Sequence, residues 1–163
     1  MPTKKFDRKL YEDSDSLSKE VMSSWLSKHG YTDIDTEETY GVDIICEKGG
    51  MPSYFETEIK YGWKGEWPNT WEEIRIPYRK FKIIQKWIRE GSKGTLTFVI
   101  FKSDCKQAWF IDGMTVWQSD VKEFNNRYSY NEKFFHINVN YAYIINIGDD
   151  DVTKDLINTK YPS

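Results

Sequence analysis

The fold of this protein is decided by residues 41–60, GVDIICEKGGMPSYFETEIK. The run from Val42 to Cys46 is rich in β-branched residues, and the sequence from Tyr54 to Lys60 changes side-chain character with a period of two. Lys48-Gly49-Gly50 lies between them and supplies residues that suit a tight turn. We therefore expect a β-hairpin here.

The second strand of this hairpin carries three ionisable side chains on one face. Successive side chains of an extended strand point to opposite faces, so Glu56, Glu58 and Lys60 share a face. An exposed strand edge with solvated Glu–Lys neighbours is the simpler explanation of this pattern alone. Asp43 favours a site instead, because it stands just inside the partner strand, close enough across the hairpin to converge with Glu58.

Converging carboxylates favour the binding of a hard cation. Two carboxylates at one point repel, and each raises the pKa of the other unless a cation lies between them. Mg²⁺ in proteins uses one or two carboxylates together with substrate phosphates and water. A lysine beside such an ion can orient the attacking water and offset charge that develops on phosphorus. The pattern therefore suits hydrolysis of a phosphodiester.

The sequence resembles the Asp…(Asp/Glu)-x-Lys signature of the PD-(D/E)XK nuclease superfamily, with Gly41-Val42-Asp43 before the hairpin turn and Glu58-Ile59-Lys60 after it. Val42 stands where the name of the superfamily has a proline. The resemblance covers residues 15–102. It implies a restriction-endonuclease-like α/β fold, a mixed β-sheet core flanked by helices in the order αβββαβ. It also implies that Asp43, Glu58 and the backbone carbonyl of Ile59 bind Mg²⁺, for which Mn²⁺ can substitute. Lys60 is then the residue that positions or activates the attacking water.

Several members of this superfamily carry a further acid on the first helix, and here Lys19 falls at that position. The candidates for a fourth acid are Asp15, Glu20 and Glu56. Glu20 is expected to point to solvent and Asp15 to lie nearer the apolar stripe of the helix, although either can simply complement the helix dipole. Glu56 would support the ligands or bind a second ion, or else pair with a lysine on the sheet.

A basic and aromatic segment follows the motif. Residues 60–93 contain nine lysines and arginines against four acids, so this segment has a charge of +5 within a chain of net charge −3. The candidate nucleic-acid contacts are Lys64, Trp67, Arg79, Lys80 and Lys82. Tryptophans interleaved with lysine can stack on bases, and the basic residues can contact phosphates. A core or lid role for the tryptophans and an ordinary solvated face for the lysines are the alternatives.

The remaining periodicity predicts helices and further strands. Leucine, valine, methionine and tryptophan recur at helical spacing over 16–29, with Ser16 as N-cap and Gly30 after the C-terminus. A second helix is expected to start near Pro77 and to end at Gly91. Strands are expected over 95–101 and 108–111 and within a long β-rich stretch, 134–147.

The composition is that of a folded chain. The 163 residues are 39% hydrophobic and 17% aromatic, and they predict one domain over residues 1–163. No apolar run approaches the roughly 20 residues of a membrane-spanning helix, so no membrane partner is expected. Cys46 and Cys105 lack the spacing of a zinc site or a disulfide framework, which favours a cytoplasmic setting.

The sequence thus predicts a Mg²⁺-dependent endonuclease that hydrolyses DNA phosphodiesters, with a homodimer expected if both strands are cut. The alternative is a non-catalytic nucleic-acid-binding or assembly protein that keeps the nuclease fold. A metal-dependent enzyme acting on RNA or on a small phosphate ester is the third possibility.

Overall fold

The predicted hairpin is the centre of the fold. The structure, a computed structural model, describes residues 8–38, 41–124 and 132–147, without the side chains of residues 8–15 and 124. Strands β2 (Ile44–Lys48) and β3 (Met51–Lys60) pair antiparallel on either side of Gly49 and Gly50. Both glycines have positive φ angles, 61° and 78°, which a tight two-residue hairpin turn requires. The turn pairs Lys48 with Met51 and therefore sets the register of every later pair.

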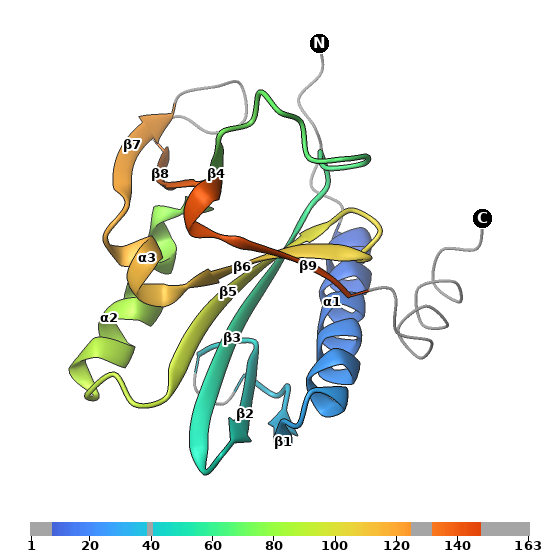
Figure 1. Ribbon diagram of the computed structural model, residues 1–163, viewed down its shortest axis with the longest axis vertical. Coiled ribbons are helices and arrows are strands. Elements are labelled where there is room, and N and C mark those ends of the chain that lie inside the picture. The colour runs from blue at the N-terminus through green and yellow to red at the C-terminus, as the bar shows by residue number, and fades with distance from the viewer. Residues whose placement is uncertain (1–7, 39–40, 125–131, 148–163) are drawn as a thin grey trace.

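A six-stranded sheet grows outward from this hairpin in the order β1-β2-β3-β5-β6-β9 (Figure 1). The added strands are β1 (Thr32–Asp35), β5 (Thr95–Lys102), β6 (Gln107–Asp112) and β9 (Tyr143–Asn146). Strands β3 and β5 run parallel, and the other neighbours in this sheet run antiparallel. The sheet is therefore mixed.

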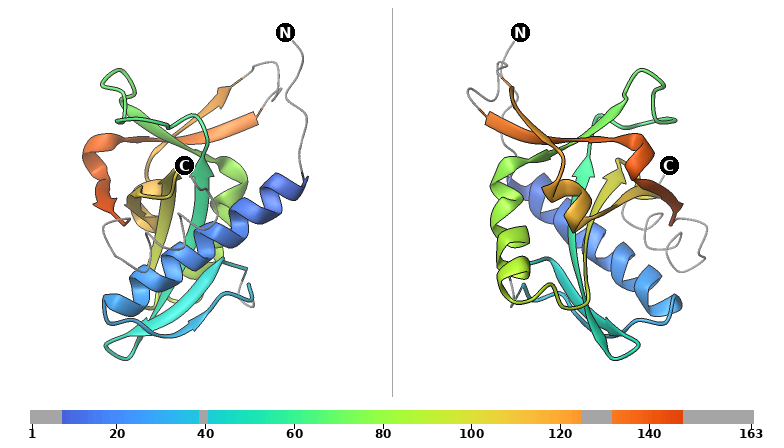
Figure 2. Two further views of the ribbon diagram at one scale, coloured as in Figure 1. Left: turned by 90° about the vertical axis from the view of Figure 1, so that its right-hand side faces the viewer. Right: turned by 60° about the vertical axis from the view of Figure 1, so that its left-hand side comes forward.

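The two faces of the sheet are covered by different elements. Helix α1 (Arg8–Lys28) covers one face, whereas α2 (Phe81–Arg89) and α3 (Gly113–Trp117) lie on the other (Figures 1 and 2). A second sheet, in the order β4-β8-β7, lies on the side of α2; its strands are β4 (Glu73–Pro77), β7 (Asp120–Phe124) and β8 (Glu132–Asn138). Short 3₁₀ helices, Tyr78–Lys80 and Val139–Tyr141, follow β4 and β8.

The alternation of β3 divides its side chains between two apolar cores. Phe55 and Ile59 pack in the core beneath α1, together with Leu17 of that helix. Tyr54 packs against the other core, which includes Trp87 of α2. The residues at 56, 58 and 60 follow Tyr54 on this second face. The hairpin therefore presents its ionisable side chains toward α2 and the second sheet.

The α/β prediction is confirmed, and several boundaries are corrected. Helix α1 begins at Arg8, so Ser16 lies within it and is not an N-cap. Gly30 does follow the helix, with φ of 87°, and the amide of Tyr31 donates to the carbonyl of Leu26 as in a Schellman motif. The predicted β-rich stretch 134–147 is divided between two sheets by the 3₁₀ turn after β8. None of the described helices is long and apolar enough to cross a membrane.

The tryptophan-rich loop between β3 and β4 is largely packed. Trp63 is fully buried, and the Trp67 ring makes edge contacts with Trp63, Trp71 and Trp109. The indole N–H of Trp67 donates to the carbonyl oxygen of Trp71 at 2.7 Å. Trp71 keeps 36% of its surface exposed. The core role is therefore confirmed for Trp63, whereas Trp71 presents part of its ring to solvent.

This difference predicts unequal costs for the same truncation. Trp63→Ala should lower the free energy of unfolding by about 3–5 kcal/mol because it leaves a large cavity in the core. Trp71→Ala should cost about 1 kcal/mol or less because its ring is already partly hydrated. Denaturant unfolding of both variants tests this expectation, and equal losses would contradict it.

Candidate active site

The hairpin register holds Asp43 in a fixed position. Asp43 is buried, and its Oδ2 accepts hydrogen bonds from the Thr57 amide at 2.8 Å and from Thr57 Oγ1 at 3.2 Å. Its own amide donates to Glu56 Oε2 at 3.3 Å. Since Ile44 pairs with Phe55, Asp43 extends the register to a position opposite Glu56. Asp43 also lies near enough to Glu58 for its charge to raise the pKa of Glu58, as the expected convergence of the two acids requires.

Glu56 is the most perturbed acid of this group. Lys80 Nζ lies 2.7 Å from Glu56 Oε1, and the Glu56 side chain is almost fully buried. Burial and the charge of Asp43 raise the pKa of Glu56 from 4.5 to about 7, although Lys80 acts in the opposite direction. Burial alone would lower the pKa of Lys80, but the surrounding acids outweigh it and raise that pKa. Lys80 thus pairs with a site carboxylate as well as being a predicted phosphate contact.

Glu58 belongs to the same electrostatic group. It lies two residues beyond Glu56 on the same face of β3. Burial raises its pKa, and the charges of Lys80, Arg79 and Lys60 partly offset this rise. The nearby charge of Asp43 raises the Glu58 pKa further. The structure therefore brings together Asp43 and Glu58 of the motif and Glu56, one of the candidates for a further acid.

Lys60 lies at the outer end of this row. Its Nζ stands 5.3 Å from the centroid of the Trp71 ring, within the range of a cation–π contact. Burial and the charge of Arg75 lower the pKa of Lys60. Lys60, Trp71 and Arg75 line a polar cavity of about 370 Å³ together with Glu72 and Glu73. Ile59 turns its side chain into the core beneath α1, so only its backbone can contribute to this face.

The region before β2 adds two groups that the sequence did not single out as site residues. Lys19 of α1 pairs with Glu38 Oε1 at 2.6 Å. This contact lowers the pKa of Glu38, and interactions with Asp43 and Lys80 lower it further. Glu20 is exposed, as predicted, and the side chain of Asp15 lies outside the described residues. Helix α1 therefore contributes Lys19, and the additional acid near Asp43 is Glu38.

The predicted nucleic-acid contacts are distributed over the loop after β3, the 3₁₀ helix Tyr78–Lys80 and α2. Lys64 is exposed in the loop after β3, and Lys82 is exposed on α2. The Arg79 side chain is 68% exposed and lies 3.3 Å from Glu132 Oε1. Trp67 is half-buried within the tryptophan cluster. Lys80 is thus the member of this set that reaches the carboxylates.

Neither a preformed metal cluster nor a relative identifies this site. Within residues 8–38, 41–124 and 132–147, no group of three or more His, Cys, Asp or Glu side chains has the arrangement of a metal site. No protein-family model matches the chain, and comparison with curated proteins gives no significant match. The geometry and electrostatics of the hairpin are therefore the basis for assigning a function.

The raised pKa of Glu56 predicts an unusual pH dependence of stability. A carboxyl group whose pKa is higher in the folded protein takes up a proton on folding, so stability falls as pH rises from about 4.5 to 7. Glu56→Gln removes this titration. Its free energy of unfolding, relative to the exposed control Glu47→Gln, should rise by up to about 3 kcal/mol between pH 4.5 and 8.

Denaturant unfolding across this pH range measures the difference. Leaving Lys80 without its partner lowers the free energy of unfolding of Glu56→Gln by an amount that does not depend on pH. This cost shifts the plot of unfolding free energy against pH without changing its slope. Parallel curves for the two variants would show that Glu56 has an ordinary pKa.

Proposed function

We propose that this protein is a metal-dependent endonuclease of the PD-(D/E)XK type that hydrolyses DNA phosphodiesters. The observation that carries the proposal is the convergence of Asp43, Glu56 and Glu58 with Lys60 and Lys80 at one face of the hairpin. The observed α/β topology is also consistent with it: α1, β1 to β3, α2 and β5 follow the order αβββαβ once β4, in the second sheet, is set aside.

The donor set fits Mg²⁺. The acids outnumber the lysines that contact them, and burial together with the charge of Asp43 raises the pKa of Glu56 to about 7. A divalent cation would relieve this repulsion, and carboxylate oxygens are the ligands that Mg²⁺ and Mn²⁺ prefer. Asp43 and Glu58 would bind the ion, with the Ile59 carbonyl as a further ligand. When bound, Mg²⁺ supplies Lewis acidity and lowers the pKa of a water ligand.

The protein residues divide the remaining tasks. The Thr57 hydrogen bonds hold Asp43 in place, so little side-chain freedom is lost when a ligand binds. Lys60, whose pKa is lowered, is suited to orient the attacking water and to accept or return a proton. Lys80 retains its charge and compensates Glu56. Its ammonium group also stabilises negative charge that develops on the phosphoryl oxygens.

Exposed cations around the site support a nucleic acid as the substrate. Lys64 is exposed in the loop after β3 and Lys82 on α2, and Arg75 and Lys60 line the polar cavity together with Glu72 and Glu73. Such cations position a phosphate backbone without reading its sequence. Specificity would then arise from other contacts or from a second copy of the chain.

Cleavage of plasmid and single-stranded DNA tests the activity. Wild-type protein should cut at least one substrate with Mg²⁺ or Mn²⁺ and should be inactive in EDTA. Asp43→Asn, Glu58→Gln and Lys60→Ala should each reduce the rate by about 100-fold or more. Lys106→Ala, at an exposed lysine outside the site, is the matched control and should keep the wild-type rate.

An intact substrate with wild-type protein, or equal cutting by the variants, would reject the nuclease proposal. Binding of DNA without cleavage would favour the non-catalytic alternative. Cleavage confined to RNA would retain the chemistry and change the substrate.

Metal binding can be measured without activity. Mg²⁺ at a concentration 100-fold above its Kd should stabilise the protein by about 2.7 kcal/mol. For a chain of this size that corresponds to a rise in melting temperature of roughly 5–10 °C. Glu58→Gln should lose this rise, whereas Glu47→Gln should keep it. A rise that is unchanged in Glu58→Gln would place the ion elsewhere.

A further inference from the structure

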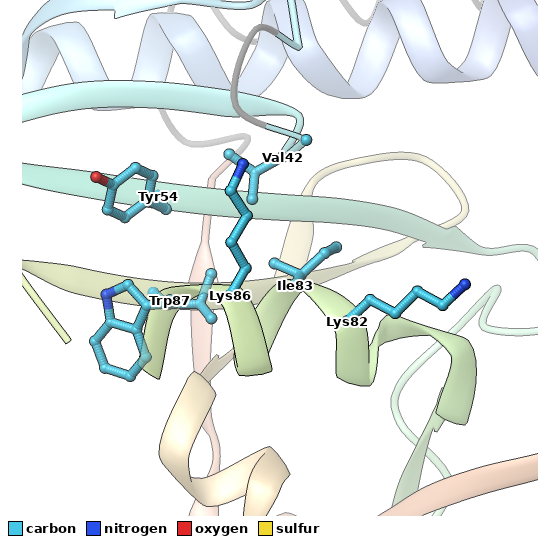
Figure 3. A pocket seen from close by; sticks show the side chains of 8 residues that line it. Val42, Tyr54, Lys82, Ile83, Lys86 and Trp87 are labelled. Atoms are coloured by element: carbon cyan, nitrogen blue, oxygen red, sulfur yellow. The ribbon is translucent and has the colours of Figure 1, made fainter. Parts of the chain in front are cut away.

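A second cavity lies between β3 and α2 (Figure 3). Its volume is about 180 Å³, and its walls are mainly apolar, formed by Val42, Tyr54, Ile83, Trp87 and Leu96. An apolar protein cavity of about 150 Å³ is large enough to bind benzene. This cavity therefore has room for one six-membered ring and is small for a fused two-ring system.

Two aromatic side chains form part of the wall. The indole N–H of Trp87 donates to the carbonyl oxygen of Lys93 at 2.9 Å, which fixes the orientation of the ring. Trp87 is buried on α2, and Tyr54 is partly buried on β3. In Figure 3 the Tyr54 ring lies on the β3 side and the Trp87 ring on the α2 side, both to the left of the Lys86 side chain. A planar ligand ring would thus gain aromatic contacts without reordering these side chains.

The charged residues that line this cavity, in the described part of the chain, are both cations. Lys82 and Lys86 project from adjacent turns of α2. In Figure 3 the Lys86 side chain crosses from α2 toward Val42, and Lys82 extends along the helix away from Tyr54. Among the residues that the structure describes, no acid shares this lining. The complementary ligand is therefore a flat ring that carries a negative group.

The cavity adjoins the proposed site through both of its walls. Tyr54 precedes Glu56 on the same face of β3, a separation of about 7 Å along the strand. Ile83 follows Lys80 by about one turn of α2. Val42 is the neighbour of Asp43 in the chain. A ring in the cavity would therefore lie about one nucleotide from a phosphate held at the carboxylates.

We propose that this cavity binds a pyrimidine nucleotide, with its base between the apolar walls and its phosphate on Lys82 and Lys86. The nucleotide is either a residue of the substrate strand, which rests on the proposed function, or a free mononucleotide. If the nucleotide belongs to a DNA strand, its base must be unstacked from the neighbouring bases to enter the cavity. In single-stranded DNA this unstacking has a low energetic cost.

The test measures binding in EDTA, where no metal-dependent cleavage occurs. Fluorescence anisotropy compares a ten-residue thymidine oligonucleotide with an oligonucleotide of ten abasic residues. Wild-type protein should bind the thymidine strand about tenfold more tightly, the effect of one stacked base. Ile83→Phe, which fills the cavity, should reduce this preference to about twofold or less and leave abasic binding unchanged.

The matched control is Ile88→Phe. Ile88 is also partly buried on α2 but does not line the cavity, so this variant should keep the preference. Thermal melting confirms that both variants fold. Should Ile83→Phe fail to fold, Lys86→Gln provides the second variant and should weaken the binding of thymidine monophosphate by about fivefold.

Competition by mononucleotides identifies the source of the ligand. Displacement of the thymidine strand by thymidine monophosphate, and not by the deoxyadenosine nucleotide, would support a site for the free nucleotide. A base preference of the strand without such displacement would support a strand residue. Equal binding of thymidine and abasic strands, with no displacement by either mononucleotide, would overturn the proposal.

These outcomes are separate from those of the cleavage assay. If the protein prefers the thymidine strand but cleaves no DNA, the nuclease proposal is rejected and the proposal of a nucleotide site in the cavity is retained. Cleavage that is unaffected by Ile83→Phe, together with equal binding of the thymidine and abasic strands, would retain the nuclease proposal and reject the nucleotide site in the cavity.

Discussion

The hydrogen bonds between Asp43 and Thr57 join the fold to its proposed chemistry. A buried carboxylate is costly unless hydrogen bonds satisfy it, and Thr57 provides both its amide and its hydroxyl to Asp43 Oδ2. This contact depends on the hairpin register, which depends in turn on two glycines with positive φ. A shift of one residue would turn Glu56, Glu58 and Lys60 toward the core beneath α1. The local turn thus determines which face of the sheet carries the ionisable side chains.

Lys80 shows how much of the site comes from outside the motif. The sequence assigned the positive charge of the site to Lys60, whereas the carboxylate of Glu56 is paired with Lys80. Lys60 instead lies against Trp71, next to a polar cavity. The two lysines therefore come from different elements, Lys80 from the 3₁₀ helix that follows β4 and Lys60 from the end of β3.

The parts of the molecule that the sequence predicted well are local. The hairpin, the C-terminus of α1 and the sharing of one face by Glu56, Glu58 and Lys60 all follow from short-range periodicity and turn chemistry. Strand β1 was missed because it is short and lacks a clear alternation, and β4 was missed because its alternation extends over only five residues. The Lys80–Glu56 and Lys19–Glu38 pairs join residues far apart in the chain, so no local sequence pattern predicts them. The burial of Trp63 likewise depends on tertiary packing.

The parallel pairing of β3 with β5 has a consequence for the order in which the molecule is assembled. Tyr54 pairs with Leu96, so about forty residues must form a closed loop before this contact is made, at an entropic cost that the two-glycine hairpin largely avoids. The 3₁₀ helix that carries Lys80, and α2 after it, lie inside that loop. The hairpin can therefore form while Glu56 is still hydrated, and its acidity changes when the loop closes. Proton uptake by this carboxyl group would then mark a late step of folding.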